Sequence, residues 1–185
     1  MDGNFSRKID DGIEIRTREP EEAEGFLSLL DANRERVTPW FPWLAGIESV
    51  DDMRRSIEYH QRIFRSGIGL CVGVYMGGEP AGMINLGGMD EEARHASLDY
   101  WIGAEFEGKG LVTRGCRVML EFSFEELDLN RVEISCADEN TRSRAIPPRL
   151  GFTHEATRRE YIWLGDHYAD QLIFGLLARE WRGGP

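Results

Sequence analysis

A glycine-rich segment near the middle of the chain constrains the fold more than any other feature of the sequence. Residues 106–113 read Phe-Glu-Gly-Lys-Gly-Leu-Val-Thr and follow an apolar run at 98–103 that is typical of a β-strand. From Leu111 onward the apolar residues have the spacing of a half-buried helix. A turn between a strand and a helix N-terminus presents backbone N–H groups and the positive end of a helix dipole. The segment therefore predicts an α/β fold with a phosphate or pyrophosphate site at this turn.

Two common nucleotide-binding loops match this segment only in part. Residues 103–110 follow the P-loop pattern G-x-x-x-x-G-K-[ST] up to its last position, where Gly110 replaces the hydroxyl residue that would hold Mg²⁺. Residues 108–113 follow the dinucleotide-binding pattern G-x-G-x-x-G until Thr113 replaces the third glycine. The chain that follows is also too short for a second mononucleotide-binding half. We therefore discount both loops.

A third pattern fits the segment better. Acetyltransferases of the GNAT superfamily carry R/Q-x-x-G-x-G/A between a strand and a helix, and residues 107–112 resemble this pattern. The central Gly110 matches it, whereas Glu107 and Val112 depart from it. Because backbone N–H groups bind the phosphates, neither departure prevents binding.

The segments around the loop extend the resemblance over essentially the whole chain. They comprise Tyr100-Trp101-Ile102, residues 122–133, residues 140–145, Leu150-Gly151-Phe152 and residues 176–181. Their order is similar to that of the ribosomal-protein N-terminal acetyltransferases, a GNAT branch that acts on terminal Ser or Ala. The resemblance implies a single N-acetyltransferase domain over residues 1–185. It also implies the α/β GNAT fold, in which helices flank a mixed, mostly antiparallel sheet of about seven strands.

The apolar patterns along the chain agree with such a sheet. Strands are expected at 13–16, 70–75, 81–86, 98–103, 132–136, 161–164 and 171–176. Helices are expected from Pro20, from Asp51 and over residues 111–127. Pro147 and Pro148 should shorten or kink the helix that follows Asn140.

The resemblance implies that the cosubstrate is acetyl-coenzyme A and indicates which residues hold it. The pantetheine arm would pair with the backbone of Trp101, Ile102 and Gly103, on a strand that is splayed from its neighbour. The pyrophosphate would lie against Gly108, Lys109, Gly110, Leu111, Val112 and Thr113. The Thr113 hydroxyl would add a donor at the helix start.

Asn140 and Ser143 match the N-x-x-S motif of the superfamily, whose side chains reach the pantetheine and the thioester sulfur. Ser143 is thus a candidate both for cosubstrate binding and for catalysis. A structural role is an equal alternative for each residue, because Asn is a favoured helix N-cap and Ser is common near helix starts.

The sequence departs from the superfamily where the mechanism needs acids and bases. Ser97 stands where many GNAT proteins place a Glu that takes the amine proton, and Asp99 lies two residues further along the same face of the strand. Asp99 is one candidate base, although an ordinary ion pair would also explain a carboxylate in an apolar strand. Glu160 is the second candidate, since Ile162 holds the position where the ribosomal branch carries a Glu. Pro147 occupies the place of the Tyr that many GNAT proteins use as a general acid.

The acceptor is expected to be a primary amine, and the resemblance favours the N-terminal amine of a protein. Acetylation of a small amine such as a polyamine or an antibiotic remains an alternative, as does a non-catalytic acyl-coenzyme A-binding module. Residues 39–44 (Pro-Trp-Phe-Pro-Trp-Leu) would border the acceptor groove, with Trp40 and Trp43 as candidate acceptor-binding residues. Core packing or a homodimer contact would explain this aromatic loop equally well.

Composition excludes several other classes of protein. The net charge of −11 argues against nucleic-acid binding and suits a cationic acceptor, although an acidic surface also serves solubility alone. No apolar run approaches the length of a membrane span and the N-terminal residues show no signal pattern, so we expect a cytoplasmic protein without membrane contact. Cys71, Cys116 and Cys136 are expected as reduced core thiols. The four histidines show no ligand spacing, so no metal is expected.

Overall fold

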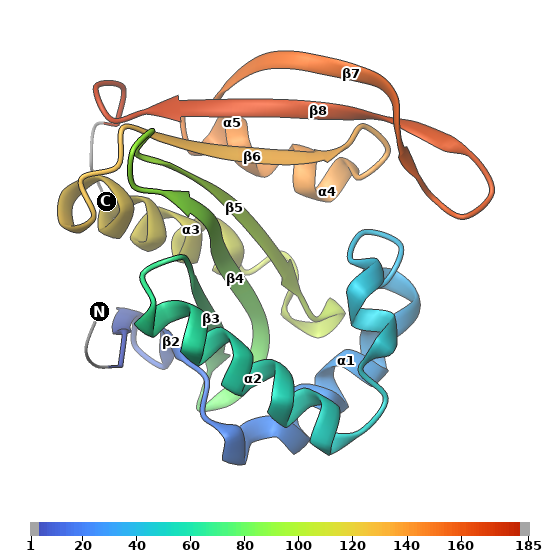
Figure 1. The fold of residues 1–185 in the computed structure, drawn as a ribbon. Helices are drawn as coiled ribbons and strands as arrows, with labels where there is room; N and C mark the ends of the chain where they lie inside the picture. The colour runs from blue at the N-terminus through green and yellow to red at the C-terminus, as the bar shows by residue number, and fades with distance from the viewer. Residues whose placement is uncertain (1–3, 182–185) are drawn as a thin grey trace.

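Eight strands form one sheet in the computed structural model, which describes residues 4–181. In chain order they are β1 (Ser6–Asp10), β2 (Ile13–Thr17), β3 (Leu70–Met76), β4 (Glu79–Asp90), β5 (His95–Ile102), β6 (Arg131–Ala137), β7 (Thr153–Trp163) and β8 (Tyr168–Leu177). Their order across the sheet is β1-β2-β3-β4-β5-β6-β8-β7 (Figure 1). Neighbouring strands are antiparallel except β5 and β6, which run parallel. The sheet is therefore mixed and mostly antiparallel, as predicted.

Five α-helices accompany the sheet in the described part of the chain. They are α1 (Ala23–Val37), α2 (Val50–Arg65), α3 (Leu111–Glu121), α4 (Thr141–Arg144) and α5 (Ile146–Arg149). Short 3₁₀ turns lie at Pro20–Glu22, Pro42–Gly46 and Ala104–Phe106, and a π-helical turn at Phe122–Glu126 continues α3. The first two helices cover one face of the sheet and α3 covers the other, with α5 packed beside it (Figure 1).

The two edge strands differ from the sequence-based expectation, and the unexpected β1 brings the sheet to eight strands, against the expected number of about seven. The apolar patterns miss β1, whose residues Ser6–Asp10 are mostly polar and exposed. They predict β7 only at 161–164, whereas this strand begins at Thr153 and is exposed along almost its whole length. An edge strand pairs on one side only, and these two bury little. Neither segment therefore shows the apolar alternation that marks a half-buried strand.

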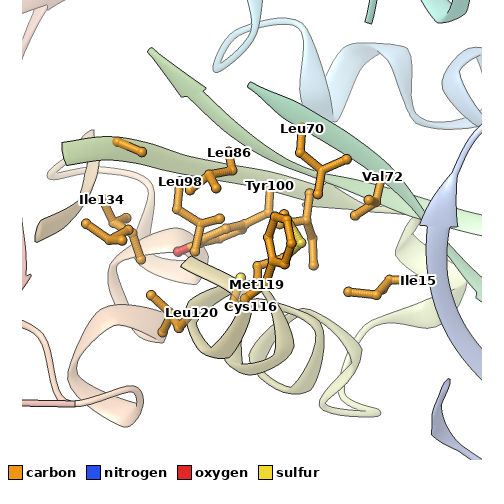
Figure 2. Close-up of a cluster of buried hydrophobic side chains, with 14 of the residues drawn as sticks. Ile15, Leu70, Val72, Leu86, Leu98, Tyr100, Cys116, Met119, Leu120 and Ile134 are labelled. Atoms are coloured by element: carbon orange, nitrogen blue, oxygen red, sulfur yellow. The ribbon is translucent and has the colours of Figure 1, made fainter. Parts of the chain in front are cut away.

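Alternation along the strands builds an apolar layer on each face of the sheet. Figure 2 shows the layer against α3, with Ile15, Leu70, Val72, Leu86, Leu98 and Tyr100 from the sheet and Cys116, Met119 and Leu120 from the helix. Trp101 and Met83 belong to the opposite layer, against α1 and α2. Successive side chains of a strand point to opposite faces. Asp99 and Tyr100, which are neighbours on β5, therefore lie on opposite faces of the sheet.

Helix α3 lies unusually close to the sheet at Gly115. A Cβ added at this position would lie 2.5 Å from Cδ1 of Ile84 on β4, a distance that real contacts do not reach. The absence of a side chain at Gly115 therefore lets the helix backbone rest against β4.

The sheet opens between β5 and β6. The two strands pair only through residues 95–97 and 131–133. Beyond this point β5 remains paired with β4 as far as Ile102, whereas β6 remains paired with β8 as far as Ala137 (Figure 1). The splay implied by the resemblance is therefore present, and the candidate site forms at the separated ends of these two strands.

The remaining structural expectations concern single residues. The segment after Asn140 forms two four-residue helices, α4 and α5, and Pro147 and Pro148 lie in the second, so the predicted break is confirmed. Cys71, Cys116 and Cys136 are free and buried, as expected of core thiols. No helix within residues 4–181 is both long enough and apolar enough to cross a membrane. In the same residues, no three His, Cys, Asp or Glu side chains gather in the way a metal site would require.

Candidate active site

The glycine-rich loop leads from β5 into α3, as the sequence predicts. Gly110 is the N-cap residue of α3 with φ 71°, and Gly108 has φ 73°. These left-handed conformations favour glycine because other residues adopt them only with strain. The first intrahelical bond runs from the Arg114 N–H to the Gly110 carbonyl oxygen (3.0 Å). The N–H groups between these residues have no acceptor within the helix, which is the arrangement that binds phosphate.

A cavity of about 530 Å³, here called the loop cavity, lies beside this turn. Most of the predicted cosubstrate-binding residues line it, namely Trp101, Ile102, Gly108, Gly110, Leu111, Val112, Thr113, Asn140 and Ser143. Further lining comes from Arg36, Trp40, Phe41, Tyr100, Phe106, Arg142 and Arg149, among others. The fold thus brings β5, the loop, α3 and α4 around one space whose volume is typical of small-molecule sites.

Two predicted cosubstrate residues lie outside this lining. The Lys109 ammonium lies 5.3 Å from the ring centroid of Phe106, which is a cation–π distance. The Gly103 N–H donates to the Ala81 carbonyl oxygen (2.8 Å) and extends the pairing of β5 with β4 by one residue. A Cβ added at Gly103 would lie 2.8 Å from Cδ1 of Leu29, so a larger residue there would require the Leu29 side chain of α1 to shift.

Asn140 and Ser143 are held together at the start of α4. The Asn140 side-chain oxygen accepts a hydrogen bond from the Ser143 N–H (3.1 Å), so Asn140 is the N-cap that its residue type predicts. The Ser143 hydroxyl donates to the hydroxyl of Tyr100 (3.4 Å), which in turn donates to the Ser143 carbonyl oxygen (3.2 Å). Through these contacts α4 is joined to β5 across the splay of the sheet.

A second cavity of about 270 Å³, here called the gap cavity, lies between the separated strands. Its lining includes Pro39, Leu98, Asp99, Ile134, Ser135, Cys136, Ala137, Ile162 and Gln171. It shares Trp40, Phe41, Tyr100, Asn140 and Ser143 with the loop cavity. These five shared residues, here called the common wall, mark the place where ligands of the two cavities would meet.

Asp99 places a buried carboxyl group in the gap cavity. It accepts a hydrogen bond from the neutral side-chain amide of Asn85 (2.9 Å), and none of the ion pairs within residues 4–181 includes it. Burial raises the pKa of the Asp99 carboxyl to about 6, although the hydrogen bond from Asn85 opposes this rise. A carboxyl group with such a pKa can exchange protons near neutral pH.

The structure does not bring Glu160 to either cavity. Arg158 pairs with Gln171 and Ile162 with Ala169, so β7 has two more residues than β8 between these pairs. Glu160 lies in the resulting bulge, is exposed and has φ 51°. A bulge interrupts the alternation of a strand, so residues two apart no longer share a face. Ile162 therefore lines the gap cavity while Glu160 does not.

The two tryptophans of the aromatic loop have different positions. Trp40 belongs to the common wall. Trp43 lines neither cavity, is 48% exposed, and packs with its ring centroid 6.5 Å from that of Phe41 and 6.3 Å from that of His60. Of these two tryptophans, only Trp40 is therefore placed to contact ligands in the cavities.

An ion-pair bridge borders the loop cavity. Glu107, at the position where the superfamily pattern has Arg or Gln, pairs with Arg36 of α1 and with Arg142 of α4, whose Nε lies 3.3 Å from Glu107 Oε2. The two guanidinium groups offset a carboxylate that would otherwise repel a pyrophosphate bound nearby. The bridge explains how this loop accommodates an acidic residue.

Sequence reasoning misses Tyr100 and the Arg36–Glu107–Arg142 bridge as parts of the site. It includes Phe41 only as a member of the loop at 39–44 that is expected to border the acceptor groove. Tyr100 follows Asp99 directly, but only the splay between β5 and β6 gives both of these residues access to one cavity. The bridge joins residues that are 71 positions apart in the case of Arg36 and Glu107, and no local pattern indicates such a contact.

Comparison with known proteins identifies the family. Residues 13–153 match the family described as "Acetyltransferase (GNAT) domain". The match covers well over half of the chain. The chain therefore belongs to the GNAT acetyltransferases and is an N-acetyltransferase.

Individual relatives agree with this assignment. YdaF of Bacillus subtilis (strain 168), named provisionally as a ribosomal N-acetyltransferase, is 37% identical over 180 residues, which are 97% of this chain and 98% of that protein. The microcin C7 self-immunity acetyltransferase MccE, solved with acetyl-CoA and AMP, is 25% identical, with a TM-score of 0.85 over 92% of this chain and 94% of that one. RimL, a ribosomal L7/L12 α-N-protein acetyltransferase solved with coenzyme A, has a TM-score of 0.89 over 94% of this chain and 98% of that one. At 18% identity, the likeness to RimL concerns the fold alone.

Proposed function

We propose that this N-acetyltransferase takes acetyl from acetyl-coenzyme A and transfers it to the N-terminal amine of a protein. The observation that carries the proposal is the meeting of the loop cavity and the gap cavity at the common wall. One cavity leads to a phosphate-binding turn and the other to a buried carboxyl group. A transfer between two substrates requires such an arrangement, because the reacting groups must meet while each substrate keeps its own channel.

The loop cavity is the proposed site of acetyl-coenzyme A, which supplies the thioester. The backbone N–H groups at Gly108–Thr113 would bind its pyrophosphate. The stretch of β5 that is separated from β6 would pair with its pantetheine arm, and this stretch includes Trp101 and Ile102. The arm would then end at the common wall near Ser143. The complexes of MccE with acetyl-CoA and of RimL with coenzyme A support this assignment.

The gap cavity is the proposed site of the acceptor amine. An amine is mostly protonated at neutral pH and must lose a proton before it attacks the thioester. Asp99 is the proposed acceptor of that proton, because its carboxyl group lines this cavity and its pKa is raised to about 6. In the balanced reaction Asp99 takes one proton from the ammonium group and the neutral amine then forms the C–N bond. The C–S bond breaks and its electron pair stays with sulfur, while the second proton lost by the nitrogen passes to water.

A protein N-terminus is the proposed acceptor for two reasons. YdaF, which matches the chain over nearly its whole length, is named provisionally for ribosomal substrates. The net charge of −11 also favours the approach of a cationic amine.

The test is the release of coenzyme A thiol from acetyl-coenzyme A with matched acceptors. Lysine-free peptides that begin with Ser or Ala should react, and mass spectrometry should place the acetyl group on the α-amine. The same peptides with a blocked N-terminus should release no more thiol than buffer does. Faster turnover with spermine than with any peptide would instead indicate a small-amine acetyltransferase. Coenzyme A binding without turnover of any amine would indicate a binding module.

A further inference from the structure

The departing sulfur requires stabilisation, and the common wall offers two hydroxyl groups for it. When the C–S bond breaks, sulfur acquires a negative charge, and a hydrogen-bond donor at that position lowers the barrier. The second turn of the segment after Asn140 carries prolines, which provide no donor from their side chains. The hydroxyl groups of the common wall belong to Ser143 and Tyr100.

We propose that Tyr100 is a catalytic residue whose hydroxyl donates a hydrogen bond to the sulfur of coenzyme A as the C–S bond breaks. The first amine proton still passes to Asp99. The second passes to water, which returns a proton to the thiolate once coenzyme A leaves. The proposal rests on coenzyme A as the acetyl carrier. It does not depend on which amine is the acceptor.

The position of the Tyr100 hydroxyl follows from the splay of the sheet. Tyr100 lies on β5 three residues beyond the last pair with β6, in the stretch where the two strands are separated. Its ring belongs to the apolar layer against α3, where the side chain is 8% exposed (Figure 2). Its hydroxyl reaches the start of α4, at the boundary of both cavities.

The hydrogen bonds of this hydroxyl are weak ones. The bond to the Ser143 carbonyl oxygen is 3.2 Å long and the bond from the Ser143 hydroxyl is 3.4 Å long. Both exceed the range of about 2.5–3.0 Å that is usual between oxygen atoms. A bound sulfur can therefore replace the carbonyl oxygen as acceptor at little cost, while Ser143 continues to orient the phenol.

The protonation state of Tyr100 suits a donor. Burial raises its pKa above the ordinary value, and the nearby Cys116, Cys136 and Asp99 act in the same direction, while the hydrogen bond with Ser143 opposes them. The phenol therefore stays protonated throughout the neutral range. At neutral pH, therefore, a protonated phenol and an ionised Asp99 are present together.

The structure supplies a matched control in Tyr75. This tyrosine is also buried in the same sheet, and its hydroxyl donates to Glu22 (2.8 Å), but it lines neither cavity. Both Tyr→Phe substitutions remove a single oxygen atom from a buried ring. Only Tyr100→Phe removes a donor that the sulfur can reach.

The first measurement compares turnover and binding. Tyr100→Phe should lower kcat about 100-fold, the usual effect of deleting a donor to developing charge. Its affinity for coenzyme A and its circular dichroism should stay close to those of the wild type. Tyr75→Phe should lose stability but keep kcat. A Tyr100→Phe protein with unchanged kcat would overturn the proposal.

The second measurement needs no acceptor and detects the contact with sulfur directly. A donor at the sulfur lowers the pKa of the thiol of bound coenzyme A, so thiolate absorbance in the complex should appear at lower pH in the wild type than in Tyr100→Phe. Titration of the ligand-free protein serves as the baseline, since burial raises the pKa of the Cys116 and Cys136 thiols. An equal thiol pKa in both complexes would overturn the proposal. A wild-type protein that binds no coenzyme A would contradict the proposed function, and this proposal with it.

Discussion

At the scale of single residues, Asp99 decides how the amine loses its proton. Its pKa of about 6 leaves the carboxyl group ionised at neutral pH and protonated in acid. We expect Asp99→Asn to lower kcat/KM about tenfold or more at neutral pH, because general-base catalysis contributes at least that much. The loss should shrink at alkaline pH, where the amine deprotonates without help. A pH–rate profile of both proteins measures this difference.

The same substitution should raise stability. A carboxyl group whose pKa rises on folding, here from 3.8 to about 6, is destabilising when ionised. This destabilisation is absent below the pKa of the unfolded state and complete above the pKa of the folded state. The free energy of unfolding of Asp99→Asn should therefore exceed that of the wild type by about 2–3 kcal/mol at neutral pH and should equal it in acid. Asp51→Asn is the control. Asp51 lies in the first turn of α2 and pairs with Arg54 on the exposed surface, so this substitution should leave activity unchanged and lower stability by less than about 1 kcal/mol. Full activity of Asp99→Asn across the pH range would show that water alone removes the proton.

The two candidate bases show what sequence reasoning can establish at this scale. The alternation of β5 is regular, so the face of Asp99 could be predicted from its position. The face of Glu160 could not be, because the bulge in β7 depends on pairing with β8 and leaves no local signal. The place of Tyr100 in the site could not be predicted either, because its access to the site depends on the separation of two strands.

At the scale of elements, the loop and α3 act together as the proposed phosphate site. Gly110→Glu should abolish coenzyme A binding, because it places a carboxylate among the N–H groups at the start of α3. Gly77→Glu is the matched control, since Gly77 also has a positive φ (63°) and open surroundings but lies in the turn between β3 and β4. Both variants should lose about 1–2 kcal/mol of stability from backbone strain. Titration calorimetry with coenzyme A measures the difference: Gly77→Glu should bind it as the wild type does, and Gly110→Glu should not bind it.

Either of two outcomes would contradict this assignment of the loop. One is a folded Gly110→Glu protein with wild-type affinity for coenzyme A. The other is tighter binding of ATP or NAD than of coenzyme A by the wild type, which would restore the discounted loop types.

The elements also differ in how far the sequence predicts them. The helical spacing predicts one helix over 111–127, whereas α3 ends at Glu121 and continues as a π-helical turn. In this turn the Leu127 N–H donates to the Phe122 carbonyl oxygen (3.0 Å). The buried Ser123 hydroxyl donates to the Met119 carbonyl oxygen (2.6 Å). Apolar spacing cannot distinguish these helix types, because one widened turn hardly changes which residues are buried.

At the scale of the whole molecule, the two ends of the chain share one core. Phe5 near the N-terminus and Leu176 near the C-terminus belong to the same apolar cluster against α3. The eight strands form a single sheet within residues 4–181, although the pairing of β5 with β6 is short. We propose that the chain is a single domain, as the resemblance to GNAT proteins implies.

A single domain of this kind should unfold in one cooperative transition. Coenzyme A at 100 times its Kd should stabilise the folded state by about 2.7 kcal/mol, which corresponds to a rise in Tm of about 5–10 °C for a chain of this size. Gly110→Glu should unfold in one transition as well, without the rise. Calorimetry tests both statements in one experiment. Two transitions, of which coenzyme A moves only one, would instead show that β1–β5 and β6–β8 fold as separate units joined at the short parallel contact, with the phosphate site in the unit that moves.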